Sequence, residues 1–130
     1  SSLEGKQVLK FSVYHPERCE ELCAPYFTPA WKDKVTLAAA GKEWMDSTPP
    51  EGEKSIAVEF IRQRLGISLE ETCTFGDNLN DIAMLRKAGM SYAVANARAE
   101  VQAAARKVCP SYSEDGVLQI LKRIVSESRK

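Results

Sequence analysis

The sequence predicts an α/β protein in which a doubly wound parallel sheet follows a smaller β-α-β-β unit. After residue 52, short β-favouring runs alternate with segments of helical periodicity, the pattern of parallel strands joined by crossover helices. The pair Pro49-Pro50, followed by Gly52, interrupts both periodicities and marks a boundary. One expected strand ends in a Gly-Asp turn that opens a helix, and open α/β sheets bind ligands at such switch points.

Residues 1–50 are expected to form the β-α-β-β unit. Alternating hydropathy predicts a first strand with Leu9, Phe11 and Val13 on its buried face. The helix that follows should end or kink near Pro25, because proline lacks a backbone donor. The expected elements, in order, are a strand over 8–14, a helix over 17–27, and strands over 34–40 and 43–48 joined by a tight antiparallel turn at 41–42.

Residues 51–130 are expected to alternate helix and strand. The first helix should end at Gly66 and a later one at Gly89, since glycine favours left-handed caps at helix C-termini. The expected helices cover 54–65, 80–88, 99–107 and 117–125, and the expected strands cover 72–75, 91–95 and 108–109. The apolar residues expected to face inward are Ile56, Ala57, Phe60, Ile61 and Leu65 on the first helix, and Val117, Leu121, Ile124 and Val125 on the last.

Charge and hydropathy argue against several classes of partner. Lys plus Arg equals Asp plus Glu at 18 each, so no basic excess is present to bind nucleic acid or an anionic membrane. No apolar run approaches the ~20 residues of a membrane span, and a cytoplasmic protein is expected. Cys19 and Cys23 lie four residues apart, but no second Cys or His pair accompanies them. We therefore expect free thiols, and we interpret His15 as a turn residue.

The Gly76-Asp77 turn and the helix after it carry the candidate site. Asp77 is expected at the strand tip, with Asn78, Asn80 and Asp81 around the first helical turn. Two carboxylates four residues apart suit an oxygen-preferring cation such as Mg²⁺, and the two amides can cap the helix or donate to an anion. The alternative is a capped helix after a surface turn, where Asp and Asn are common for that reason alone.

The pattern Gly76-Asp77-x-x-Asn80-Asp81-x-x-Met84-Leu85 resembles the fourth motif of haloacid dehalogenase (HAD) superfamily phosphatases of the Cof type. The resemblance implies that Asp77 is a catalytic Mg²⁺ ligand and that Asn80 contacts the phosphoryl group of the substrate. It also implies that Asp81 is a second catalytic acid, which lies near the metal or braces the loop.

The segment Glu53-Lys54-Ser55-Ile56-Ala57-Val58, followed by Gly66, resembles the lysine-bearing third motif of the same family. By this resemblance Lys54 is a catalytic and substrate-binding residue that holds the phosphoryl group or the nucleophile's carboxylate. A lysine suits either role as a point cation. Without the resemblance, a solvated lysine at a helix start is the simpler interpretation. The family often has Lys-Gly here, whereas this sequence has Lys54-Ser55.

The resemblance also implies a Rossmann-like, HAD-type fold. Residues 51–130 would be the C-terminal half of the core domain, and residues 1–50 the C-terminal part of an inserted α/β cap. The family's nucleophile lies in an Asp-x-Asp motif, and no two aspartates of this chain are separated by a single residue. The expected function is therefore a Mg²⁺-dependent phosphatase of small phosphorylated metabolites such as sugar phosphates, acting through an aspartyl-phosphate intermediate whose nucleophile lies outside this chain.

This interpretation predicts that the isolated chain is inactive. It also leaves a sheet edge exposed, which should pair with the N-terminal half of the same protein or with a second copy. Two alternatives stay open: a non-catalytic α/β binding or regulatory domain, and a phosphotransferase or mutase on the same scaffold.

Overall fold

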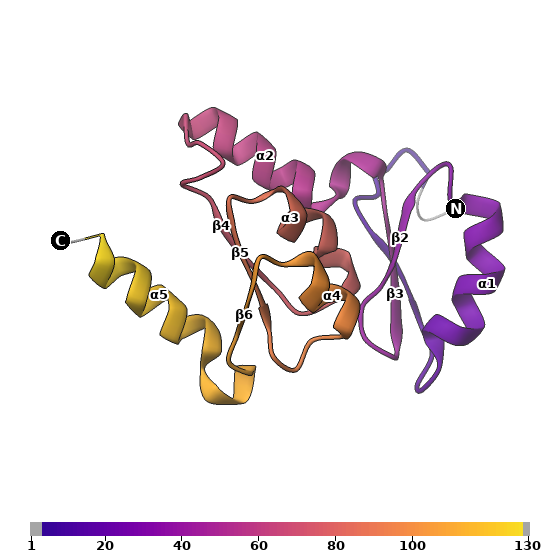
Figure 1. Cartoon of the computed structure of the whole chain (residues 1–130). Helices are drawn as coiled ribbons and strands as arrows, with labels where there is room; N and C mark the ends of the chain where they lie inside the picture. The colour runs from indigo at the N-terminus through magenta and orange to yellow at the C-terminus, as the bar shows by residue number, and fades with distance from the viewer. Residues whose placement is uncertain (1–3, 129–130) are drawn as a thin grey trace.

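The computed structural model describes residues 4–128, in which two three-stranded sheets lie beside each other (Figure 1). The first sheet and its helix form what we call the antiparallel unit, which comprises β1 (Phe11–Tyr14), α1 (Cys19–Trp31), β2 (Thr36–Ala39) and β3 (Trp44–Thr48). A short 3-10 turn, η1 (Pro50–Gly52), leads into the rest. What we call the parallel unit comprises α2 (Lys54–Leu65), β4 (Cys73–Gly76), η2 (Leu79–Asp81), α3 (Ile82–Lys87), β5 (Met90–Val94), α4 (Ala99–Ala104), β6 (Lys107–Cys109), η3 (Tyr112–Glu114) and α5 (Gly116–Glu127).

The antiparallel unit has the expected β-α-β-β order, with β3 in the centre of its sheet and antiparallel to both neighbours. Its first strand is shorter than predicted, and the face expected to be buried is largely open. Leu9 is 81% exposed and Phe11 is 58% exposed. The predicted burial is therefore wrong at Leu9 and Phe11, although Phe11 and Val13 do line an apolar groove with residues of α1. A single helix is too narrow to cover the whole face, so the groove stays accessible.

Helix α1 continues past Pro25 to Trp31, so of the two predicted outcomes at Pro25, an end or a kink, the end is wrong. Pro25 and Pro29 both lie inside the helix. Their spacing of four residues puts both missing backbone donors on one helix face, which a helix can tolerate by bending rather than ending. At the other end, His15 accepts a hydrogen bond from the backbone N–H of Arg18, at 3.2 Å, which confirms its place in the turn before the helix.

The parallel sheet has the order β4-β5-β6, with both strand pairs parallel, and helices pack on its two faces (Figure 1). Tyr92 and Val94 of β5 point to one face and pack with Ile120 of α5. Ala93, between them, points to the other face and packs with Leu85 of α3 and Val101 of α4. This period-two alternation between two helical layers confirms the predicted doubly wound parallel sheet.

Helix α2 has the predicted bounds, and Gly66 caps it in the left-handed conformation at φ 67°. The prediction that its apolar stripe is buried is wrong: Phe60 is 63% exposed and Leu65 is 64% exposed. Ser55 is the residue of α2 that is buried. The apolar residues do share one face of the helix, as predicted, but no element within residues 4–128 covers that face.

Three details of the later elements differ from the prediction. Helix α4 ends at Ala104 rather than at residue 107, and β6 already begins at Lys107. Gly89 does not cap α3; its backbone lies against Leu69, and a Cβ there would be 2.2 Å from the Leu69 carbonyl oxygen. Glycine is needed at this position for close approach of two chain segments. On α5, Ile120 enters the core, whereas Leu121 and Val125 are exposed, so the buried stripe is centred one position earlier than expected.

The remaining expectations concern thiols and membranes. All four cysteines are free, as predicted. Within residues 4–128, no helix is long and apolar enough to cross a membrane. The division into domains at residue 50 stays a prediction, and residues 1–3 and 129–130 of those ranges lie outside the described part of the chain.

Candidate functional site

The candidate site lies at the C-terminal edge of β4, where the chain passes through η2 into α3. Asp77 follows Gly76 at the end of the strand and is exposed. Asn78 begins the 3-10 turn, and its side chain accepts a hydrogen bond from the backbone N–H of Leu79, at 2.8 Å. The expected strand-turn-helix arrangement is therefore present, with a 3-10 turn in place of the first turn of the helix.

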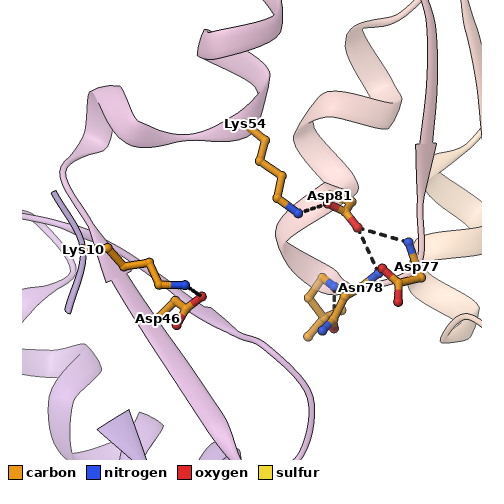
Figure 2. A network of polar contacts seen from close by, with 7 residues as sticks. Lys10, Asp46, Lys54, Asp77, Asn78 and Asp81 are labelled. Carbon is orange, nitrogen blue, oxygen red and sulfur yellow. Dashed lines mark hydrogen bonds and ion pairs between the residues drawn. The ribbon is translucent and has the colours of Figure 1, made fainter. Parts of the chain in front are cut away.

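Asp81 holds this turn together. One carboxylate oxygen, Oδ2, accepts hydrogen bonds from the backbone N–H groups of Asp77, at 3.0 Å, and Asn78, at 3.2 Å. The other oxygen, Oδ1, accepts from Lys54 Nζ at 2.5 Å (Figure 2). The whole residue is only 3% exposed. Asp81 therefore fixes the backbone of Asp77, and with it the position from which the Asp77 carboxylate extends.

Gly76 makes room for this contact. A Cβ at this position would lie 2.6 Å from the Cβ of Asp81 and 3.1 Å from a methyl carbon of Leu85. Real Cβ atoms essentially never approach another atom as closely as 2.6 Å, so a larger residue would push Asp81 away from the strand end. Glycine is therefore required at position 76 because Asp81 approaches it closely, in addition to the turn preference from which the Gly-Asp turn was predicted.

Lys54 reaches the site from the first turn of α2, which packs against α3. A second contact fixes the same pair of helices, because Lys87 donates to Ser55 at 3.2 Å. The Lys54 side chain is 52% exposed, so its ammonium can contact a ligand while it also donates to Asp81. Lysine at a helix start would be an ordinary solvated residue without the buried carboxylate facing it.

The charge of Asp81 is favoured by its surroundings. Burial alone would raise the pKa of Asp81, but the hydrogen bond from Lys54, the two backbone hydrogen bonds and the Lys54 charge hold the pKa below its ordinary value. The residue is therefore ionised at neutral pH.

Asn80 lies in the same 3-10 turn and carries a buried acceptor. Its Oδ1 atom is buried and has no hydrogen-bond partner within residues 4–128. The residue lines a cavity of about 430 Å³ between the two units, together with Lys54, Leu79 and Ile82. A buried acceptor without a partner is costly, so a donor from a ligand or from another segment would be stabilised at this position.

The residues present fit a Mg²⁺ ion in part. No cluster of three or more His, Cys, Asp or Glu side chains able to hold a metal occurs among residues 4–128. Both oxygens of Asp81 already accept hydrogen bonds, which favours the loop-bracing role over direct ligation. Asp77 is exposed at the strand tip and remains as the available carboxylate. Mg²⁺ is usually held by one or two carboxylates, several waters and substrate phosphate, so one ligand from this segment is sufficient for a shared site.

The structure brings together Lys54, Asp77, Asn80 and Asp81, the candidates from sequence. Asn96, in the turn after β5, accepts a hydrogen bond from the Tyr112 backbone N–H at 3.2 Å. Sequence reasoning missed Lys10 and Asp46, which form an ion pair on the opposite wall of the cavity. Strand alternation over residues 8–14 puts Lys10 and Ser12 on the face opposite Leu9, Phe11 and Val13, which was the available signal.

The fold and the site define an α/β protein with a lysine–carboxylate pair at the ligand-binding edge of a parallel sheet. The family model of haloacid dehalogenase-like hydrolases matches residues 1–121. The chain therefore belongs to this family, in its Cof-type branch.

Three relatives illustrate the match. Phosphatase YwpJ of Bacillus subtilis is 31% identical over 118 residues, which are 91% of this chain and 40% of that protein. A crystal structure from Eubacterium rectale is 52% identical with a TM-score of 0.72, covering 92% of this chain and 45% of that one. A sugar phosphatase of HAD subclass IIB is 30% identical with a TM-score of 0.79, covering 92% and 44%. The chain thus spans less than half the length of these relatives.

Proposed function

We propose that the protein carrying this chain is a Mg²⁺-dependent phosphatase of small phosphorylated metabolites such as sugar phosphates. Membership of a hydrolase family and the likeness to phosphatase YwpJ support the reaction class, and the likeness to a HAD subclass IIB sugar phosphatase supports the substrate class. The observation that carries the proposal is the hydrogen-bonded set at the end of β4, in which buried Asp81 holds both the Lys54 ammonium and the backbone of Asp77.

Each residue has a defined part in this proposal. Lys54 contacts the phosphoryl oxygens as a point cation, and Asn80 forms a hydrogen bond to the same group or its shell. Asp77 would hold Mg²⁺, which when bound would shield the charge of the phosphoryl group. Asp81 fixes the positions of Lys54 and Asp77. The nucleophilic aspartate, which would form the aspartyl-phosphate intermediate, lies outside residues 1–130.

The proposal also includes the binding partner of this chain and its location in the cell. The N-terminal half of the protein, or a second copy of the chain, would cover the free edge of β4 and the exposed stripe of α2. A cytoplasmic location stays a prediction, which the free thiols support because such thiols persist in reducing compartments.

Phosphate release by the full-length protein tests the reaction. Asp77→Asn and Lys54→Met should each lower kcat/KM for glucose 6-phosphate in Mg²⁺ by about 100-fold or more, the scale of losing one pre-organised charge contact. Asp33→Asn is the matched control, because Asp33 is an exposed turn residue, and it should retain full activity. Unchanged rates in Asp77→Asn would refute the assignment.

Two further measurements separate the alternatives. Purified residues 1–130 should release no phosphate with Mg²⁺, and an Asp77-dependent rate from this segment would place the nucleophile within it. A product assay with added sugar acceptors distinguishes hydrolysis from phosphoryl transfer, since a mutase or phosphotransferase would form a new phosphate ester in place of free phosphate.

A further inference from the structure

The turn that carries the candidate site contains one apolar residue, Leu79. It lies between Asn78 and Asn80 in η2 and is half-buried. Its backbone N–H donates to the Asn78 side chain at 2.8 Å, so its backbone belongs to the hydrogen-bonded turn that Asp81 holds together. A displacement of Leu79 therefore also displaces the residues on either side of it.

One side of the Leu79 side chain packs on the core of the parallel unit. It lies against the buried cluster formed by Leu85 of α3, Ala93 of β5 and Val101 of α4, each of which is fully buried. Protein cores are close-packed and deform little, so this cluster is a rigid support beneath Leu79.

The opposite side of Leu79 faces the antiparallel unit. It lines a cavity of about 200 Å³, and every other described residue that lines this cavity belongs to α1, β2 or β3. Ala24 of α1 and Ala38 of β2 are among these residues, and each side chain is a single methyl group. Within residues 4–128, the contact between β2 and η2 is the most extensive one between the two units. Leu79 is therefore held between the two units.

The contact beside Leu79 is of a different kind. Glu20 lines the same small cavity and pairs with Arg98 of the parallel unit. The two side chains are 42% and 37% exposed, so solvent and salt screen their attraction. Burial of the Leu79 side chain is not screened in this way, because it depends on apolar area removed from water. Leu79 is thus the apolar part of this junction.

We propose that Leu79 is a positioning residue that couples the docking of the antiparallel unit to the geometry of the turn at residues 77–81. With the unit docked, the side chain is enclosed on both sides, and the turn holds Asp77 and Asn80 in place relative to Lys54. This inference rests on the proposed phosphatase function. It deepens that function by naming an apolar residue through which the antiparallel unit acts on the turn.

Leu79→Ala in the full-length protein tests the coupling. The variant opens a gap between the units and releases the turn, so kcat for glucose 6-phosphate and for phenyl phosphate should fall together by about 10- to 100-fold, the scale of a small misplacement of reacting groups. Leu118→Ala is the matched control, because it makes the same change at an exposed position of α5, and it should keep full activity.

A compensating change on the facing wall distinguishes coupling from a local packing role. Ala24→Leu should restore kcat of Leu79→Ala to within about threefold of the wild type, because it returns the lost volume from the antiparallel unit. Ala24 lines the small cavity but not the cavity of about 430 Å³ beside Lys54, so this rescue does not come from a contact with the substrate. Ala24→Leu alone should keep kcat within about twofold, since the small cavity has room for the larger side chain.

Two further measurements guard against misfolding. The backbone amide resonances of Asp77 and Asn78 should shift in Leu79→Ala and return to their wild-type positions in the double variant. The milder pair, Leu79→Val with Ala24→Val, repeats the comparison with a smaller change of volume, and it decides the question if Leu79→Ala does not fold. In this pair the kcat lost through Leu79→Val should again be recovered.

The outcomes separate this inference from the proposed function. If the wild-type protein releases no phosphate, the proposed function is wrong, and the two resonances decide the coupling by returning or not returning in the double variant. If phosphate is released and Leu79→Ala keeps full activity, or loses activity that Ala24→Leu does not restore, the phosphatase assignment survives and the role of Leu79 is overturned.

Discussion

Arg98 donates two hydrogen bonds to Glu20, with Nη1 at 3.1 Å from Oε1 and Nη2 at 2.6 Å from Oε2. Arg98 lies directly before α4 in the parallel unit, and Glu20 lies in the first turn of α1 in the antiparallel unit. A bidentate arginine–carboxylate pair has a preferred geometry, so this contact joins the two units in a defined orientation of the two side chains. It lies among charged residues outside the cavity that holds Lys54.

Arg98→Gln should loosen the contact between the units without unfolding either. The pair is partly exposed, so its loss should cost about 0–1 kcal/mol of stability. Hydrogen exchange should become faster in the first turn of α1 and around Arg98, and stay unchanged in β5. Arg18→Gln is the control, because it breaks the Arg18–Glu21 pair inside the antiparallel unit. Equal effects from both variants would show that the Arg98 pair does not fix the units.

The Arg98–Glu20 pair also predicts that Glu20 titrates with a lowered pKa. The hydrogen bond from Arg98 is the main cause that holds the pKa of Glu20 below its ordinary value of 4.5. A carboxyl with a lowered folded pKa contributes stability above its unfolded pKa, and that contribution is lost as the pH falls through the folded value. Carbon-detected NMR should show the Glu20 pKa below 4.5 in the wild type and closer to 4.5 in Arg98→Gln.

Glu21 provides the internal control for this titration, because Arg18 lowers its pKa independently of Arg98. Its titration should be the same in both proteins. A Glu20 pKa that does not respond to Arg98→Gln would contradict the contact.

Asp81→Asn should destabilise the parallel unit. The amide that replaces the carboxylate accepts through one oxygen only, and its NH₂ group would face either Lys54 or the two backbone donors of Asp77 and Asn78. The expected loss is about 1.5–3 kcal/mol, measured as a lower midpoint in urea with an unchanged m-value. Asp115→Asn, at an exposed residue whose side chain forms no cap, should be neutral. Equal midpoints for both variants would contradict the bracing role.

Gly76→Ala should displace Asp81 from the end of β4. The added methyl would meet the Asp81 Cβ at 2.6 Å, and overpacking of this kind costs about 1–3 kcal/mol. The amide resonances of Asp77 and Asn78 should shift, because both groups donate to Asp81. Gly66→Ala separates backbone strain from contact: its φ is 67° but no atom lies within 4 Å, so it should lower stability and leave those two resonances in place.

Residues 1–130 alone should self-associate as their concentration rises. Strand β4 has a neighbour on one side only, and the α2 stripe is exposed. Sedimentation velocity should show dimers or larger species, and Phe60→Glu should reduce them by placing a charge in the stripe. Leu118→Glu, at an exposed apolar residue of α5, is the control and should have no effect. A single monomer at all concentrations would contradict this prediction.

Local signals were sufficient to predict much of this fold. The bounds of α2 followed from the proline pair before it and from Gly66 after it, and the parallel sheet followed from alternation of strands and helices. The spacing of Asn78 and Asp81 matches a capping box, which the structure contains. This spacing would have favoured a bracing role for Asp81 from the start.

Contacts between distant segments could not be predicted in the same way. Lys54 and Asp81 are 27 residues apart, and only the family resemblance connected them. Arg98 and Glu20 are 78 residues apart and carried no signal. Gly89 directly follows a predicted helix, as a capping glycine would, but its close approach to Leu69 depends on tertiary packing. The stripe of α2 has a correct period, and its exposure depends on what lies beyond residues 4–128.

The connection between β3 and α2 is short and stiff. Pro49 and Pro50 each have a restricted φ, and the Gly52 N–H closes the turn by donating to the Pro49 carbonyl at 2.8 Å. Asp46 lies before this connection and Lys54 after it, so a tilt of the strand moves the ammonium as well. The orientation of β3 in the antiparallel unit is thus tied, through only a few residues of restricted backbone, to the start of α2 that carries Lys54.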